Sequence, residues 1–474
     1  MSKGLQVSEK KRIFVRLFAI VQMNQKNSTA YKEHLKRLLH TGVPIMLGQL
    51  GTIIMGFADT LMVGRYSTEA LAAAGFVNNI IGLTLILGLG FSYGLTPIVS
   101  ALYGRGETGQ IAGKLKNSLL ANNLLSLVLV GLMLLLWAVM PQLGLPAELL
   151  PLMRPYLLIL SVSILPQMAF NALKQFSEGI QDTRTPMWVL IGANALNIML
   201  NWVFIFGRLG CPSMGLEGAG LATLVSRIAA WGVMSLLFHR HTRYRTYARA
   251  FGKAHVQTAD LREMNRMGLP LAMQMGMEAA SFSLTAIYVG WLGSASLAAH
   301  QIMITIGQLC FMLYYGLSAA VAVLVGYHRG RNEMDDTRLV ARTGLWMTWA
   351  LGVLCVVPLF LLRYRIGGWF TDSAEVSRLV VSAIIPLILY QFGDCMQCIY
   401  ANALRGMADV RPLVPIAFFA YFVVSLPLGY LFGFPLQGGL TGVWMAFPFG
   451  LTTAGVLYYI RFRQTYHKGC LQKT

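Results

Sequence analysis

Charged side chains are scarce in this chain of 474 residues. Only 12% of the residues are Asp, Glu, Lys or Arg, whereas 56% are hydrophobic. A soluble globular domain carries about 25% charged residues. Acidic residues are the scarcest, with 19 Asp and Glu against 38 Lys and Arg, so the formal net charge is +19. This composition excludes an ordinary soluble domain.

Cysteines and nucleotide-binding motifs are also few. The six cysteines are scattered, which does not fit a disulfide framework. The CMQC segment at 395–398 has the spacing of a redox pair but no second pair of ligands, so we interpret it as helix-packing residues. The segment TGQIAGKL lacks the first Gly and the Ser/Thr of a phosphate-binding loop. We therefore expect no cofactor and no enzymatic activity.

Long apolar runs are abundant. A membrane-spanning helix needs about 20 apolar residues, and the chain contains twelve such runs. The sequence therefore predicts an all-α polytopic membrane protein with twelve transmembrane helices. The runs lie at about 42–63, 76–101, 118–140, 152–175, 187–207, 215–238, 267–290, 297–326, 344–362, 380–404, 412–433 and 440–460.

The basic residues are concentrated on one side of this predicted topology. Thirty of the 38 Lys and Arg fall in the N-terminal segment, the loops that follow even-numbered spans, and the C-terminal tail. Under the positive-inside rule this predicts that both termini are cytoplasmic. We expect contact with anionic lipid, and no nucleic-acid partner.

The two halves of the chain repeat one another. The segment that begins GVPIMLGQLG at Gly42 aligns without a gap with GLPLAMQMGM at Gly268, and EGIQDTR at 178–184 aligns with RGMADVR at 405–411. Each half holds six spans, so both halves enter the membrane in the same orientation. The predicted divisions are an amphipathic segment 1–40, a first lobe 41–238, a basic linker 239–266, a second lobe 267–462 and a tail 463–474.

Polar residues form two stripes in the second lobe, one in span seven and one in span ten. Glu278 follows cytoplasmic Arg266 by twelve residues, and Asp394 precedes cytoplasmic Arg405 by eleven. At 1.5 Å per residue both carboxylates lie roughly 17 Å into the membrane. We therefore expect them on facing helices, close enough to share a cation. The stripes are Gln274, Glu278, Ser281 and Thr285, and Tyr390, Asp394 and Gln397.

The repeat assigns this acidic pair to the second lobe alone. Glu278 aligns with Thr52, and Asp394 aligns with Gln167. Symmetric packing therefore does not explain the two acids, which together would share a proton or capture a cation. We expect Na⁺ to bind Glu278 and Asp394, with H⁺ as the alternative, because the two stripes offer more oxygen ligands than a proton requires.

The first lobe has one acid of its own. Asp59 shares a helical face with Gln49, and span five carries Asn194, Asn197 and Asn201 at i, i+3 and i+7. Asparagines inside a membrane need hydrogen-bonding partners. We expect them to bond with Asp59 or with neighbouring helices. His300 and His328 stand alone near the ends of their spans, so the sequence gives them only a weak case for carrying protons.

Several segments together resemble the multidrug and toxic compound extrusion (MATE) family, and within it the bacterial NorM branch. The resemblance covers about residues 40–460. It implies a twelve-helix antiporter that exports organic cations and amphipathic drugs in exchange for Na⁺ or H⁺. It also implies cation binding by Glu278, Asp394 and Tyr390, and a first-lobe site at Asp59 and Asn197. The segments are MGFADTLMVG, GLEGAGLAT, GLPLAMQMGMEAASF, AAHQI and QFGDCMQCIYANALRGMADVR.

The sequence leaves other functions open. A flippase for lipid-linked precursors would show similar helical arrays, but it should have a basic cavity, whereas the charges predicted inside this membrane region are acidic. A channel or structural membrane protein would tolerate neutral replacements of Glu278 and Asp394. We expect a monomer with small cationic or amphipathic substrates, in which the two lobes rock about a central site.

Overall fold

A computed structural model describes residues 2–144 and 146–471, with side chains described from residue 30 onward. The described residues form helices and connecting turns, without a β-strand. The helices of the first half are α1 (Ser2–Tyr66), α2 (Thr68–Ser92), α3 (Leu95–Arg105), α4 (Thr108–Val139), η1 (Met140–Gln142), α5 (Leu150–Gly179), α6 (Arg184–Phe206) and α7 (Gly215–Arg240). The linker forms η2 (Thr242–Tyr244) and α8 (Arg245–Lys253).

The helices of the second half repeat this arrangement. They are α9 (Thr258–Trp291), α10 (Ser294–Gly330), α11 (Met334–Ile366), η3 (Gly367–Trp369), α12 (Ala374–Gly406), α13 (Leu413–Phe418), the π-helical turn η4 (Phe419–Ser425), α14 (Leu426–Gly433) and α15 (Gly439–Leu471). The twelve predicted spans all correspond to helices. Helices α2 and α3 together form span two, and α13, η4 and α14 together form span eleven.

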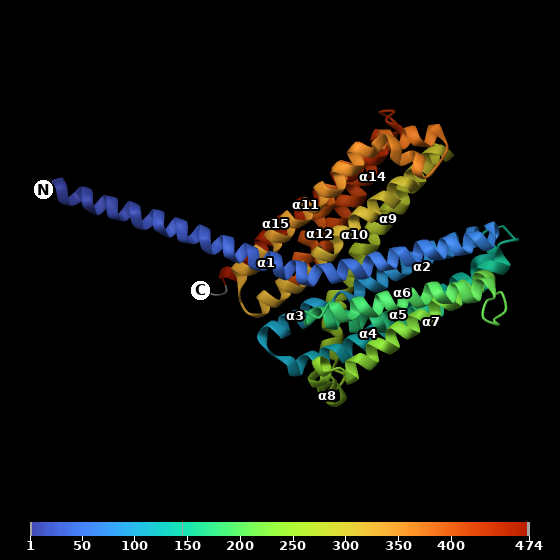
Figure 1. The fold of residues 1–474 in the computed structure, drawn as a ribbon, viewed down its shortest axis with the longest axis horizontal. Helices are drawn as coiled ribbons and strands as arrows, with labels where there is room; N and C mark the ends of the chain where they lie inside the picture. The colour runs from blue at the N-terminus through green and yellow to red at the C-terminus, as the bar shows by residue number, and fades with distance from the viewer. Residues whose placement is uncertain (1, 145, 472–474) are drawn as a thin grey trace.

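Eleven helical segments of the described chain are long and apolar enough to cross a membrane. The twelfth predicted span, α9, falls short of that hydropathy, because its inner face carries polar residues that include Gln274 and Glu278. Helix α9 nevertheless runs alongside the others in the second half of the fold (Figure 1). The twelve-helix fold is therefore confirmed, and the one weakly apolar span, α9, carries one of the two polar stripes.

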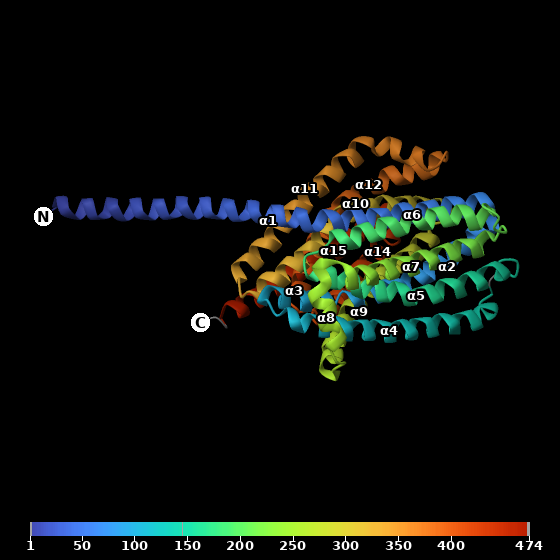
Figure 2. The same cartoon turned by 60° about the horizontal axis from the view of Figure 1, so that its bottom comes forward.

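The helices form two lobes, one from α1–α7 and one from α9–α15 (Figure 1). The lobes touch at the end of the molecule where both chain termini lie, which we call the terminal end, and diverge toward the far end. Helix α8 lies beside α4 (Figure 2), where Lys116 Nζ donates to the Ala254 carbonyl at 2.8 Å. In this V shape the lobes are in contact from the terminal end as far along the helices as Leu87 of α2 and Gly276 of α9.

The internal repeat is visible in the packing between lobes. A Cβ at Gly104 would overlap the carbonyl oxygen of Tyr327, and a Cβ at Gly330 would overlap the carbonyl oxygen of Ala101. Gly104 and Gly330 are 226 residues apart, as are Ala101 and Tyr327. The same close backbone contact therefore occurs twice, once in each direction across the interface.

A second correspondence lies in the turns that leave the fourth and tenth spans. Gln181 and Ala408 both adopt a left-handed backbone conformation, with φ of 62° and 57°. Such a conformation is uncommon for a residue other than glycine. These residues occupy equivalent positions of the repeated segments EGIQDTR and RGMADVR. The two halves therefore repeat backbone conformation as well as sequence.

The predicted domain boundaries are not marked by breaks in the helices. Helix α1 continues through residue 40 into the first span, and α15 continues through residue 463. The side chains of residues 1–29, on which the predicted amphipathic character depends, lie outside the described part of the structure. The division into segment, lobes, linker and tail therefore stays a prediction.

Candidate functional site

The second lobe contains a polar cluster around Glu278. Glu278 projects from α9, where Gln274 Nε2 one turn earlier donates to Glu278 Oε2 at 3.1 Å. Gln397 on α12 reaches across and donates from Nε2 to the same oxygen at 3.2 Å. The hydroxyl of Tyr421, on the π-helical turn η4, also lies next to this carboxylate. Glu278 therefore meets side chains from three different elements.

Asp394 lies in the same cluster, three residues before Gln397 on α12. Its carboxylate accepts a short hydrogen bond from the Tyr314 hydroxyl of α10. The Cys398 thiol donates to Asp394 Oδ1 at 3.6 Å, and Tyr390 lies beside the carboxylate one turn earlier. Asp394 is only 2% exposed. The two predicted acids are close enough for the charge of Asp394 to act on Glu278, so both belong to one cluster.

Two oxygens in this cluster have no hydrogen-bond partner within the described part of the chain. They are Gln397 Oε1 and the Tyr421 hydroxyl, and both atoms are buried. Among the described residues, no Lys or Arg side chain forms a hydrogen bond or ion pair with Glu278 or Asp394. Hard cations such as Na⁺ prefer carboxylate, carbonyl and hydroxyl oxygens. The residues present therefore fit a small cation, with unused oxygens and an uncompensated negative charge.

The first lobe holds a smaller cluster around Asp59 of α1. Asn201 Nδ2 of α6 donates a short hydrogen bond to Asp59 Oδ1, and also donates to Asn197 Oδ1 at 3.1 Å. Asn197 Nδ2 in turn donates to Thr223 Oγ1 at 3.3 Å and to Ser226 Oγ at 3.5 Å, both on α7. The asparagines therefore bond to Asp59 and also hold α6 against α7.

Arg227 gives the Asp59 cluster a positive charge that the cluster around Glu278 and Asp394 lacks. It lies on α7 next to Ser226, interacts electrostatically with Asp59, and donates from an Nη atom to Ser163 Oγ at 2.6 Å. The first-lobe cluster thus contains one acid and one base, whereas the second-lobe cluster contains two acids. The sequence analysis distinguished the two clusters by their number of acids. The structure shows that they also differ in the presence of a base.

Three other residues considered in the sequence, Gln49, Ser281 and His300, form no hydrogen bond with the carboxylates of these clusters. Gln49 is partly exposed and forms no hydrogen bond with Asp59. Ser281 is 3% exposed, but its backbone carbonyl accepts from Thr285 and its side chain does not bond to Glu278. His300, considered as a weak proton carrier, accepts from Trp444 Nε1 at 3.1 Å and lies away from both acids.

Sequence reasoning missed Tyr314, Tyr421 and Arg227. The two tyrosines lie in strongly apolar spans, where an aromatic residue is equally suited to face lipid or the core. Arg227 is a base within the sixth predicted span, 215–238. Charged residues inside a membrane usually pair with one another. The sequence places Arg227 and Asp59 within spans of the same lobe, so their pairing was predictable.

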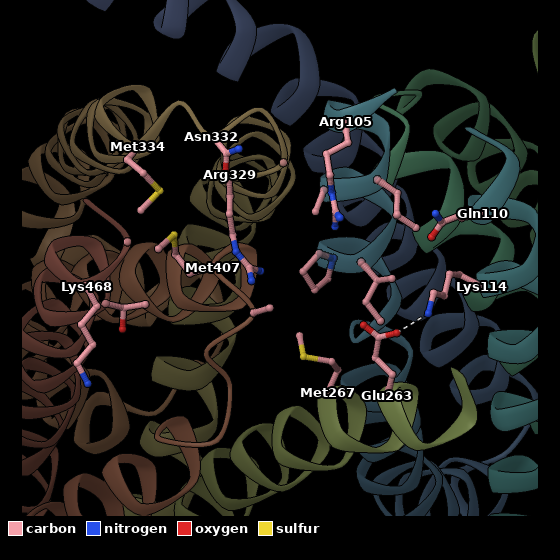
Figure 3. Close-up of a pocket in the computed structure, with 18 residues that line it drawn as sticks. Arg105, Gln110, Lys114, Glu263, Met267, Arg329, Asn332, Met334, Met407 and Lys468 are labelled. Carbon is pink, nitrogen blue, oxygen red and sulfur yellow. Dashed lines mark hydrogen bonds and ion pairs between the residues drawn. The ribbon is translucent and has the colours of Figure 1, made fainter. Parts of the chain in front are cut away.

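A cavity of about 1080 Å³ lies at the terminal end, away from either acidic cluster. Figure 3 shows basic side chains from both lobes pointing into it, with Lys114 bonded to Glu263 across one wall. Arg105 of the first lobe and Arg329 of the second lie near each other on its rim. The basic cavity is thus found where the lobes meet, and the acidic clusters lie deeper in the helical region.

Comparison with known families agrees with this architecture. Residues 44–203 and 270–431 each match the MatE family, so the match occurs once in each half. The chain belongs to the MatE family. The two matched segments coincide with the two lobes, so the family assignment and the internal repeat describe the same duplication.

Individual relatives extend the comparison along most of the chain. A protein named Multidrug resistance protein NorM, from Vibrio vulnificus, is 28% identical over 440 residues, which are 91% of this chain and 95% of the relative. The eukaryotic MATE transporter AtDTX14 superposes with a TM-score of 0.83 at 17% identity, covering 94% of this chain and all of that one. The VcmN transporter of Vibrio cholerae superposes at 0.82 with 16% identity, covering 93% and 98%. The last two similarities concern the fold.

Proposed function

We propose that this protein is a secondary active antiporter that exports organic cations and amphipathic drugs in exchange for Na⁺. The observation that carries the proposal is the pair of membrane-embedded carboxylates, Glu278 and Asp394, gathered in one cluster without a basic partner. The relative from Vibrio vulnificus bears a multidrug resistance name, which supports drugs as the exported class. The protein would lie in a bacterial inner membrane as a monomer, with both termini in the cytoplasm.

The charge of the second lobe supports Na⁺ there. Two carboxylates without a counter-ion, one buried (Asp394) and one half-buried (Glu278), repel one another, so binding a cation or a proton stabilises the pair. The unpartnered oxygens of Gln397 and Tyr421 add ligands that Na⁺ can use and a proton does not need. We therefore favour Na⁺ as the coupling ion, and H⁺ is the alternative because either ion can neutralise the same carboxylates.

The first lobe supports a different role. Asp59 already has a base in Arg227 and an amide donor in Asn201, so its charge is partly compensated. This cluster is suited to organising the first lobe or to contacting a drug cation that displaces Arg227 from Asp59. Rocking of the lobes would then expose the two clusters alternately, and a ligand drives such a change only through different affinities for the two states.

The flippase alternative is less well supported by the distribution of charge. A lipid-linked pyrophosphate needs a basic cavity along its path through the membrane. The basic cavity lies at the terminal end, at Arg105, Lys114, Arg329 and Lys468, whereas the deeper clusters are acidic or neutral. A cationic substrate fits that interior better than an anionic one.

Proteoliposomes containing the purified protein test the coupling directly. Uptake of a fluorescent organic cation is measured under a Na⁺ gradient at fixed pH, and separately under a pH gradient in Na⁺-free buffer. We expect uphill transport with the Na⁺ gradient. Transport driven only by the pH gradient would make Glu278 and Asp394 proton carriers, and transport that merely follows the drug gradient would exclude antiport.

A further inference from the structure

His328 is not the isolated histidine that the sequence suggested. It ends α10 at the terminal end, and its Nδ1 atom lies 2.7 Å from Glu333 Oε2 in the turn before α11. Single ligand atoms of His328, Glu333 and Asp336 all lie within 4.8 Å of one another. Among the described residues this is the one group of three such side chains with that spacing.

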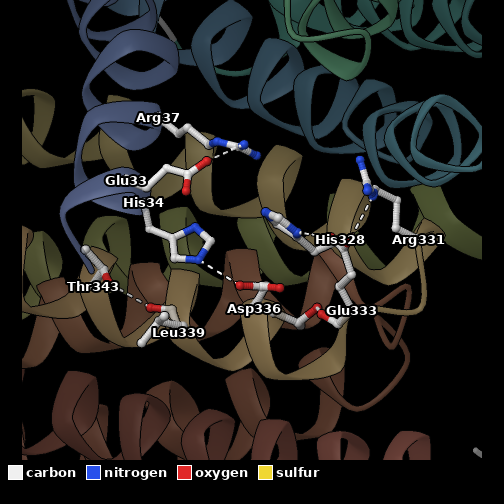
Figure 4. Close-up of polar contacts among 10 residues, drawn as sticks. Glu33, His34, Arg37, His328, Arg331, Glu333, Asp336, Leu339 and Thr343 are labelled. Atoms are coloured by element: carbon white, nitrogen blue, oxygen red, sulfur yellow. Dashed lines mark hydrogen bonds and ion pairs between the residues drawn. The ribbon is translucent and has the colours of Figure 1, made fainter. Parts of the chain in front are cut away.

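A fourth residue joins this group from the other lobe. His34 of α1 lies with its Nε2 atom 3.0 Å from Asp336 Oδ1, and its ring meets the ring of His328 edge to face, with centroids 5.3 Å apart. Figure 4 shows His34 and Asp336 pointing toward each other, with His328 close by. The contact therefore bridges α1 of the first lobe and α11 of the second.

Both histidines are buried and have spare hydrogen-bonding capacity. Each is 4% exposed, and His34 Nδ1 and His328 Nε2 have no partner among the side chains that the structure describes. The carboxylate side chains of Glu333 and Asp336 are 31% and 41% exposed. The cluster is thus closed on the histidine side and open to water on the carboxylate side, so an ion could enter there.

We propose that His328, Glu333 and Asp336 bind a divalent first-row transition-metal ion, with Zn²⁺ as the probe, and that His34 positions Asp336 for it. One imidazole and two carboxylates are suitable ligands for such an ion, with water completing the shell. The ion takes the place of the hydrogen bond between His328 Nδ1 and Glu333 Oε2, and the neutral imidazole then carries its proton on Nε2.

The geometry requires only small side-chain movements. Ligand atoms around a tetrahedral ion with bonds of about 2.0–2.1 Å are about 3.3–3.4 Å apart. The separation between His328 Nδ1 and Glu333 Oε2 is shorter than this, at 2.7 Å, and no two ligand atoms of the group are more than 4.8 Å apart. Arg331 Nε holds the other carboxylate oxygen, Glu333 Oε1, at 2.8 Å, which leaves Oε2 directed at His328.

Occupancy of this site should stabilise contact between the lobes. His34 belongs to the first lobe and the three ligands to the second, so the positioned ligand Asp336 is available in full only while the terminal end is closed. A partner that orients a metal ligand commonly contributes about 10–100-fold to metal affinity. Metal binding and closure of the terminal end should therefore favour one another.

Zn²⁺ binding to the chelator-treated, full-length protein tests the proposal without any transport assay. Equilibrium dialysis with metal analysis should find one high-affinity ion per chain. Glu333→Gln and Asp336→Asn, made separately so that one remains if the other fails to fold, should each lose that ion. Glu33→Gln, an exposed carboxylate one residue from His34 that pairs with Arg37, should retain it.

His34 is tested as a positioning residue by two variants. His34→Ala should weaken Zn²⁺ binding by about tenfold or more, whereas His34→Gln, which keeps a donor toward Asp336, should recover part of the affinity. The proposal is overturned if the wild-type protein binds no ion in excess of the Glu333→Gln protein, and the role of His34 is overturned if both His34 variants bind as the wild type does. Neither result bears on drug transport.

Discussion

Each acid inside the helical region is defined by the side chains around it. Glu278 accepts from two amides and Asp394 from a hydroxyl and a thiol, all of which are neutral. Hydrogen bonds from neutral donors stabilise a carboxylate but do not cancel its charge. Asp59, by contrast, has Arg227 nearby. The charge that is free to bind a mobile cation therefore lies with Glu278 and Asp394.

Neutral replacements of these two acids should abolish ion coupling. We expect Glu278→Gln and Asp394→Asn each to weaken Na⁺ binding by at least about tenfold, which is 1.4 kcal/mol, and to abolish Na⁺-driven drug transport while expression holds. Asp372→Asn, in the exposed turn between η3 and α12, is the matched control. Normal Na⁺ affinity in both site variants would show that Glu278 and Asp394 have a structural role and do not bind the ion.

The Tyr314 hydroxyl should contribute measurably to the same site. It donates to Asp394 and lies 3.2 Å from Gln391 Oε1. A hydrogen bond to a charged group contributes about 1.5–3 kcal/mol, so Tyr314→Phe should change Na⁺ affinity by about tenfold or more. Isothermal titration of Na⁺ into the detergent-solubilised protein measures this. Tyr288→Phe on α9 is the control, and an equal effect of both substitutions would contradict a specific role for Tyr314.

At the scale of helices, the length and periodicity of apolar runs in the sequence were sufficient to predict most of the architecture. The twelve apolar runs predicted the spans because a membrane requires helices of that length. The stripes predicted that Glu278 and Asp394 face inward, because residues at i, i+4 and i+7 share a helical face. The partners on other helices could not be predicted, since they depend on how each helix is rotated against its neighbours.

Span eleven shows the limit of such reasoning. The segment FAYFVVS contains no polar residue that marks a site, except the hydroxyls of Tyr421 and Ser425. In the structure it forms the π-helical turn η4, which places Tyr421 beside Glu278. π-Helical turns are rare and occur often at functional sites. Apolar periodicity cannot distinguish such a turn from a regular helix, so this residue was absent from the predicted site.

The close backbone contact between α3 and α10 yields a prediction for these elements. A Cβ at Gly104 would overlap the Tyr327 carbonyl, whereas a Cβ at Gly113 on α4 would meet no atom within 4 Å. Gly104→Ala should therefore destabilise the described conformation by about 1–3 kcal/mol. Gly113→Ala should be neutral or stabilising by up to about 1 kcal/mol. Melting temperatures of the purified proteins measure both, and equal shifts would show that the lobes do not pack this closely.

On the scale of the whole molecule, a buried arginine holds the two lobes together at the terminal end. It stands at a position where the two repeats carry opposite charges. Position 178 of the first repeat is Glu and its equivalent, position 405, is Arg. Arg405 donates to the Tyr93 carbonyl at 3.1 Å, to Thr96 Oγ1 at 2.9 Å and to Gln175 Oε1 at 3.2 Å, all in the first lobe. A buried arginine with three acceptors from the opposite lobe must release them before the terminal end can open.

Removing this tie should shift the molecule away from the described conformation. Arg405→Ala leaves the three first-lobe acceptors without their donor, and an unsatisfied buried group costs about 1–3 kcal/mol. The shift can be measured with spin labels at Leu209→Cys and Asp372→Cys, in exposed turns of the two lobes, after the partly exposed Cys211 and Cys470 are replaced.

If the lobes rock as rigid bodies, opening of the terminal end brings the far ends together, so Arg405→Ala should increase the population with a short distance between labels. A change of 1–3 kcal/mol corresponds to about 5–150-fold in that population ratio. Arg411→Ala, an exposed arginine six residues later, should leave the distances unchanged. Identical distance distributions in the wild-type and Arg405→Ala proteins would mean that other interface contacts hold the lobes together. The hydrogen bonds of Arg405 would then be a consequence of closure and not its cause.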